Sequence, residues 1–213
     1  MTDAASAAPR HRRERELVDA AARVFAQRGY SDATVQDVAD ELGILKGSLY
    51  HYIRTKEDLL FRLYTDVHTA VDEVLAGVPG EDVPPLDRLV DYVRRVVEYN
   101  LANLALVTTY HHEIDRLSPG RREQVLAWQA PHGRFVTDMI RQAQERGEAD
   151  RDLDPAVLGR LVFASMIWTH RWFRPTGTAA PREIAAQCAD YARLGVRGHV
   201  TQRRRTDGLA VAR

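Results

Sequence analysis

The sequence has only one cysteine, Cys188, among its 213 residues. A single thiol cannot form an internal disulfide or complete a structural zinc site, so it points to a reducing compartment. No apolar run approaches the roughly 20 residues that a membrane-spanning helix needs. Residues 1–15 combine small residues with arginines and lack a following apolar stretch, which is unlike a signal peptide. We therefore expect a cytoplasmic protein with no membrane partner.

The sequence also lacks net charge, because 30 lysines and arginines balance 30 aspartates and glutamates. A protein that binds nucleic acid without specificity would be basic throughout, so this balance argues against that class. Charge is concentrated locally in residues 10–15 and again in Arg203, Arg204 and Arg205. Both clusters can be solvated tails, and the composition is still compatible with a specific DNA-binding protein.

Helical periodicity runs along most of the chain, and no segment shows the alternation typical of a β-strand. Prolines after Ser118, Asp154 and Ala180 are signals for helix starts, whereas the glycines and prolines of residues 77–85 predict a loop. The sequence therefore predicts an all-α fold of about nine helices. The first ends at Arg28, and the others cover about 34–42, 46–52, 55–76, 86–103, 105–115, 119–147, 155–174 and 181–200.

Two short predicted helices on either side of Gly43 have the spacing of a helix-turn-helix. A glycine suits the turn, because a positive φ costs a residue with a side chain roughly 1 kcal/mol or more. Leu49 and Ile53 are the expected core anchors of the second helix. Its other face is polar, with Lys46, Ser48, Tyr50, His51, Tyr52 and Arg54. Water is the simplest partner for that face, and DNA is the alternative, since such groups bind phosphates and base edges.

Three segments, residues 34–39, 43–52 and 56–60, together resemble the DNA-binding domain of the TetR family of bacterial transcriptional regulators. The resemblance covers about residues 12–62. It implies a homodimer that binds inverted-repeat operator DNA, with no cofactor and no enzymatic activity. The expected domains are a helix-turn-helix domain over 10–56 and a helical effector-binding and dimerisation domain over 57–205, with tails at 1–9 and 206–213.

The resemblance also implies roles for matching residues. Thr34 would contact a phosphate at the start of the second helix, and Lys56 would do so at the start of the fourth. The small Gly47 would let the backbone approach the DNA. The expected DNA-binding residues are Thr34, Lys46, Gly47, Ser48, Tyr50, His51, Tyr52 and Lys56. The chain departs from the family at Tyr52 and Ile53, where histidine and phenylalanine are usual, and packing on the fourth helix is an alternative role for Tyr50.

A second, shorter resemblance lies at residues 167–175, which are similar to the corresponding end of TetR-type repressors of fatty-acid and steroid catabolism. It implies an acyl-coenzyme A thioester as effector. Guanidinium groups bind phosphates bidentately, and an indole can stack on adenine. The expected effector-binding residues are Tyr110, Glu113, Trp168, Arg171, Trp172 and Arg174. The alternative is that the tryptophans belong to a dimer interface and the arginines to ion pairs.

Two further functions compete with this interpretation. One is a multidrug-type regulator of the same family, whose pocket admits varied apolar or cationic molecules. The other is a metal-dependent enzyme that uses His111, His112 and Glu113. On a helix only His112 and Asp115 share a face, and two ligands are too few for a metal site. We therefore expect no bound metal and no catalytic site.

Overall fold

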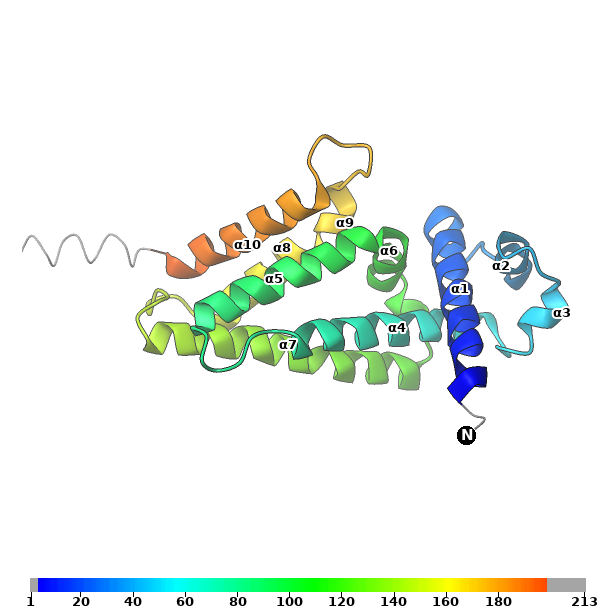
Figure 1. Cartoon of the computed structure of the whole chain (residues 1–213), viewed down its shortest axis with the longest axis horizontal. Coiled ribbons are helices and arrows are strands. Elements are labelled where there is room, and N and C mark those ends of the chain that lie inside the picture. Colours follow the sequence, from blue (N-terminus) through cyan, green and yellow to red (C-terminus); the bar gives the residue numbers. More distant parts are fainter. Residues whose placement is uncertain (1–3, 199–213) are drawn as a thin grey trace, which may run out of the picture. The chain divides into compact units, whose positions relative to one another are not determined.

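The computed structural model describes residues 4–198, with side chains from Arg13 onward. Over this range the chain forms ten α-helices, one 3-10 helix and no β-strand (Figure 1). The predicted all-α fold is therefore confirmed. The helices are α1 (Ala4–Arg28), α2 (Val35–Glu41), α3 (Lys46–Leu49), α4 (Lys56–Ala76), α5 (Pro85–Ala102), α6 (Leu104–His112), η1 (Ile114–Arg116), α7 (Pro119–Glu145), α8 (Pro155–Ile167), α9 (Thr169–Trp172) and α10 (Pro181–Arg197).

By packing, the chain divides into two compact units. Unit 1 contains the residues up to Ala70 together with Asn103–Trp128, and unit 2 contains Val71–Ala102 and the residues from Gln129 onward. The functional boundary expected after residue 56 stays a prediction. Helix α1 begins at Ala4, inside the segment expected to be a tail. Residues 206–213 and the arginine cluster at 203–205 lie outside the described residues.

The core of unit 1 includes the packing of α1 against α2 and α6. Apolar positions at helical spacing are buried in both long helices of this unit, as the periodicity predicts. They include Val18, Ala21, Ala22 and Phe25 in α1, and Leu59, Leu60, Leu63, Tyr64 and Val67 in α4. The Tyr64 hydroxyl donates to the carbonyl of Tyr110 at 2.6 Å, and the Tyr110 hydroxyl lies 2.8 Å from His68 Nε2. These buried polar groups are thus hydrogen-bonded inside the core.

The core of unit 2 is organised around α5, which α8, α9 and α10 all contact (Figure 1). One face of α5 is apolar and buried, with Leu86, Leu89, Tyr92, Val93, Val96 and Val97. An ion pair of 2.7 Å between Arg193 Nη1 and Asp87 Oδ1 adds a polar link between α10 and α5. No helix in the described part of the chain has the length and apolar character needed to span a membrane.

The segment 155–174, expected as one helix, is two helices separated at Trp168. In a continuous helix the carbonyl of Met166 would accept the amide hydrogen of His170. Here it accepts the Thr169 hydroxyl at 2.7 Å and the Asn100 amide at 3.3 Å. Two side chains thus bond to this carbonyl where one helix ends and the next turn begins. The break at Trp168 corrects the predicted single helix.

Candidate DNA-binding site

Helix α2 begins with a capping box formed by Thr34 and Asp37. The Thr34 hydroxyl accepts the backbone amide hydrogen of Asp37 at 3.1 Å. In return, Asp37 Oδ2 accepts the hydroxyl of Thr34 at 2.8 Å and the backbone amide of Thr34 at 2.7 Å. These hydrogen bonds from Thr34 lower the pKa of Asp37 below its usual range. The hydroxyl of Thr34 therefore stabilises the helix start, and its contact with a phosphate stays a prediction.

The turn after α2 depends on Gly43, whose φ is +65°. The amide of Gly43 donates to the Asp40 carbonyl at 3.0 Å, and the next amide, of Ile44, donates to the Ala39 carbonyl at 3.0 Å. These two bonds satisfy the last carbonyls of α2 and reverse the chain toward α3. The left-handed conformation expected at this glycine is thus present.

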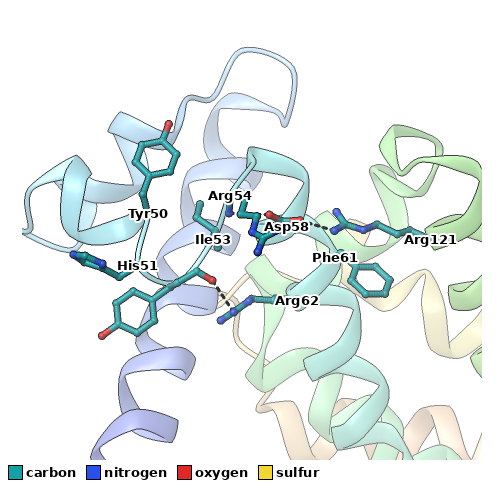
Figure 2. Close-up of a pocket in the computed structure, with 9 residues that line it drawn as sticks. Tyr50, His51, Ile53, Arg54, Asp58, Phe61, Arg62 and Arg121 are labelled. Carbon is teal, nitrogen blue, oxygen red and sulfur yellow. Dashed lines mark hydrogen bonds and ion pairs between the residues drawn. The ribbon is translucent and has the colours of Figure 1, made fainter.

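Helix α3 ends at Leu49, earlier than the expected residue 52, so Tyr50 to Ile53 lie in the turn that follows it. Together α3 and this turn have a buried side and an exposed side. Leu49 is fully buried and Ile53 nearly so, as expected for the two anchors. Lys46, Gly47, Ser48, Tyr50 and His51 are exposed, and Tyr52 is half-buried. The Tyr50 side chain is 48% exposed, and Figure 2 shows Tyr50 and His51 pointing away from Arg121. The exposed side therefore gathers five of the eight residues predicted to bind DNA.

Gly47 has no internal reason to be glycine. Its φ is not positive, and a Cβ added to it would meet no atom of the described residues within 4 Å. Glycine in a helix costs roughly 0.5–1 kcal/mol relative to alanine. Gly120, Gly133 and Gly195 have the same open space in α7 and α10, and Gly47 is distinguished from them by its place in the second helix of the helix-turn-helix. Close approach of DNA to the backbone at Gly47 is the role expected from the sequence, and it stays a prediction.

A groove with a volume of about 400 Å³ lies beside α3, between the loop that follows it and the first turns of α4 and α7 (Figure 2). Three arginines line it: Arg54, Arg62 and Arg121. Arg62 donates to the carbonyl of Tyr52 at 2.7 Å, and Arg121 pairs with Asp58. Both guanidinium groups thus fix the loop between α3 and α4, whereas Arg54 extends from that loop as an exposed residue.

Asp58 holds this loop from the first turn of α4. Its Oδ2 accepts the backbone amides of Arg54 and Thr55, each at 2.9 Å. Burial alone would raise the pKa of Asp58, but the hydrogen bonds from Arg121 and from the two amides outweigh it and lower the pKa to about 2. Asp58 is therefore ionised at neutral pH and fixes the end of the helix-turn-helix to α4 and α7.

The contacts of the Lys56 side chain differ from the phosphate contact expected from the sequence. Its ammonium donates to three backbone carbonyls, those of Tyr30 at 2.7 Å, Ala33 at 2.9 Å and Ser31 at 3.2 Å. An ammonium group has three hydrogens, so all of them have acceptors within the protein. The structure therefore favours a structural role for Lys56 over the expected phosphate contact. Arg54 belongs to the polar face predicted from the sequence, but not to the expected DNA-binding residues. It is the exposed cation at this end of the helix-turn-helix.

Two of the expected effector-binding residues, Tyr110 and Glu113, belong to unit 1. The Tyr110 side chain is buried and hydrogen-bonded to His68. The Glu113 carboxylate accepts the amide of Tyr30 at 3.2 Å and lies 3.7 Å from the guanidinium of Arg116. Both side chains thus have partners inside the protein, and a contact with an effector stays a prediction.

The other four expected effector residues gather at the junction of α8 and α9 in unit 2. Trp168 and Trp172 are 58% and 54% exposed, and the Arg171 guanidinium lies 5.7 Å from the centre of the Trp168 ring. Arg174 donates to the carbonyls of Phe173 at 2.9 Å and Arg171 at 3.1 Å, so it caps the end of α9. This surface offers exposed indole faces and the exposed side chains of Arg171 and Arg174.

Among the described residues, no three histidine, cysteine, aspartate or glutamate side chains come together as a metal ion would require. The carboxylate of Asp115 instead lies 3.2 Å from Arg122 Nη2.

An all-helical chain whose N-terminal part carries a capped α2, a glycine turn and an exposed polar α3 is a helix-turn-helix regulator. Residues 17–63 match the family described as bacterial regulatory proteins, tetR family. Residues 82–196 match the description tetracyclin repressor-like, C-terminal domain. The chain belongs to the TetR family of transcriptional regulators, which are not enzymes.

Relatives are similar over most of their length. The HTH-type transcriptional repressor KstR2 of Mycobacterium tuberculosis is 30% identical over 176 residues, which cover 82% of this chain and 88% of KstR2. A tetR-family regulatory protein from Rhodococcus RHA1 has a TM-score of 0.79 at 25% identity, covering 86% of this chain and 96% of that one. AibR, solved with isovaleryl coenzyme A and operator DNA, has a TM-score of 0.73 at 25% identity, covering 84% and 97%.

Proposed function

We propose that this protein is a cytoplasmic homodimeric repressor that binds an inverted-repeat operator through α3 and releases it when a small-molecule effector binds. The observation that carries the DNA-binding site is Gly47, whose missing side chain leaves open space on the exposed side of α3. The proposed surface consists of Thr34, Lys46, Gly47, Ser48, Tyr50, His51 and Tyr52, with Arg54 in place of Lys56.

The exposed apolar side chains of α8, α9 and α10 support dimerisation through these helices. They are Val157, Leu161, Trp168, Trp172, Tyr191 and Leu194. Val157 and Leu161 lie four residues apart in α8, so they share a face of that helix. Exposed apolar side chains gathered on neighbouring helices are typical of an interface between subunits. This arrangement favours the interface role for the tryptophans, one of the two alternatives left open by the sequence.

We propose an acyl-coenzyme A thioester as the effector. AibR, of similar fold over nearly its whole length, was solved with isovaleryl coenzyme A. In this chain the exposed Arg171 offers a guanidinium for a phosphate. Effector binding would favour a dimer whose two α3 helices are wrongly spaced for successive major grooves.

DNA binding is tested by selecting duplexes from a randomised library with the purified protein at physiological salt. We expect enrichment of an inverted repeat whose half-sites are about 10 base pairs, or a multiple of one helical turn, apart. Recovery of a library with no enriched sequence would overturn the proposal.

The effector is tested by titrating the selected complex with a panel of acyl-coenzyme A thioesters. For the productive thioester, Arg171→Gln should raise the concentration needed for release about tenfold, since a hydrogen bond to a charged group is worth roughly 1.5–3 kcal/mol. Arg174→Gln tests the other expected phosphate contact, and Arg146→Gln, an exposed arginine of the α7 end, is the matched control. If no thioester releases the DNA, this effector class is wrong, and varied apolar or cationic compounds are the next panel.

A further inference from the structure

Leu45 is the most exposed large apolar side chain in the described part of the chain, at 81%. It occupies the N-cap position of α3, with φ −68° and ψ 139°, directly before the exposed Lys46 and Gly47. The neighbouring apolar residues Leu42 and Ile44 are half-buried, and Leu49 is fully buried. Leu45 alone among them projects its side chain into solvent at the tip of the helix-turn-helix.

Nothing in the part of the chain that the structure describes accounts for leucine at this position. An N-cap residue normally carries a short polar side chain that accepts an amide hydrogen from the first turn, and serine, threonine, aspartate and asparagine are preferred. Leu45 makes no such bond. Its carbonyl accepts the Ser48 amide at 2.9 Å, which a residue of any type could do. The side chain therefore neither caps the helix nor fills the core.

We infer that Leu45 is a specificity-determining residue, which contacts the C5-methyl group of a thymine in each operator half-site. This inference rests on the proposed DNA binding. The residues at the N-terminal end of a recognition helix are those that reach base edges in the major groove. Of the four bases, thymine is the one that offers an apolar methyl group on that edge. An exposed leucine beside a glycine that permits close backbone approach matches that group in chemistry and position.

The test uses the inverted-repeat duplex selected by the wild-type protein. Each thymine of one half-site is replaced in turn by deoxyuridine, which keeps the base pair and removes only the methyl group. At one position we expect wild-type affinity to fall about three- to fivefold, the ratio expected for one buried methyl group. Leu45→Ala should bind the thymine and deoxyuridine duplexes equally, and in a new selection it should lose the preference for thymine at that position.

Two further variants separate recognition from folding. Leu126→Ala removes an exposed leucine of α7 and should keep the full wild-type response to deoxyuridine. Leu45→Ser restores a capping side chain, so its Tm should equal or exceed that of the wild type by up to about 4 °C while thymine preference is lost. A variant that is more stable yet less selective cannot be explained by damage to the fold.

The outcomes distinguish this inference from the proposed function. If a duplex is selected but no deoxyuridine substitution weakens wild-type binding, Leu45 does not read a methyl group, although DNA binding stands. If deoxyuridine weakens the wild type and Leu45→Ala equally, another side chain reads the methyl group and the inference is wrong. If no duplex is enriched, both the proposed function and this inference fail.

Discussion

Lys56 and Tyr30 are joined twice, because the Lys56 ammonium donates to the Tyr30 carbonyl at 2.7 Å and lies 4.3 Å from the centre of the Tyr30 ring. The same ammonium binds the carbonyls of Ser31 and Ala33. One charge on the first residue of α4 thus organises the whole connection between α1 and α2. The placement of α2, and with it α3, depends on a contact that faces the protein interior.

We expect Lys56→Met and Lys46→Met to affect DNA binding in different ways. Lys56→Met leaves partly buried carbonyls without their donor, so the free energy of unfolding should fall by about 1–3 kcal/mol. The slope of log affinity against log salt concentration should not change. Lys46→Met should leave stability unaltered and flatten that slope by about one ion per site. A flatter salt slope in Lys56→Met at full stability would restore the phosphate contact implied by the resemblance.

His132 in unit 2 links Tyr92 to Asp72. Its Nδ1 lies 3.2 Å from the Tyr92 hydroxyl, and its Nε2 lies 3.0 Å from Asp72 Oδ1. Burial lowers the pKa of His132 below its ordinary value, despite the opposing effect of Asp72. The unfolded chain therefore takes up a proton near pH 6.5 more readily than the folded one. This difference in pKa contributes to the free energy of unfolding at pH values above 6.5. The contribution is lost as the pH falls through the pKa of His132 in the folded protein.

The corresponding prediction concerns the change in Tm on acidification from pH 7.5 to pH 5, that is from about one unit above to about one and a half units below the ordinary histidine pKa. The wild type should lose more Tm over this range than His132→Gln, whose amide cannot take up a proton. His112→Gln, which changes an exposed histidine, is the control and should follow the wild type. Equal losses in the wild type and His132→Gln would show that His132 does not set the pH dependence.

Leu161→Arg should disrupt the dimer. Leu161 is exposed on the face of α8 that it shares with Val157, and a charge buried at a subunit interface is strongly unfavourable. We expect a monomer by light scattering at micromolar concentration, with operator affinity falling at least a hundredfold. Leu126→Arg places the same charge on an exposed leucine of α7 and should remain dimeric. If Leu161→Arg stays a dimer that binds the operator, the interface lies elsewhere.

Gly47→Ala should make the protein more stable and less active. The added methyl group meets nothing within the described residues, so the free energy of unfolding should rise by up to about 1 kcal/mol in denaturant titrations. Operator affinity should fall about tenfold or more, because the methyl group keeps the backbone away from the DNA. Gly133→Ala in α7, where a Cβ also meets nothing, should match any gain in stability without losing affinity. Unchanged affinity in Gly47→Ala would remove the main support for the proposed site.

Much of the fold could be predicted from the sequence because the relevant signals are local. Pro119, Pro155 and Pro181 begin α7, α8 and α10, as their positions after helix-start residues indicate. The break at Trp168 could not be predicted. It is accompanied by a hydrogen bond from the amide of Asn100, which is 66 residues away from its acceptor in the sequence and reaches it only once the chain has folded.

In the candidate DNA-binding site, too, local features could be predicted from the sequence and long-range contacts could not. Leu49 in α3 and Ile53 in the segment after it lie four residues apart, so helical spacing was enough to recognise both as anchors. What the sequence could not reveal is which polar groups are already engaged within the protein. In the sequence Lys56 resembles a cation that is available near a helix start. In the structure its ammonium donates to carbonyls 23–26 residues earlier in the chain.

Under the proposed function, in which a homodimer binds DNA through Gly47, the open space at Gly47 has a genetic consequence. A larger side chain there, as in Gly47→Val, would leave folding and pairing intact, so the altered subunit would still enter dimers with wild-type subunits. With equal amounts of the two and random pairing, only about one quarter of the dimers would carry two competent halves. Such an allele would therefore act dominantly over the wild type, whereas a destabilising allele such as Lys56→Met would be recessive.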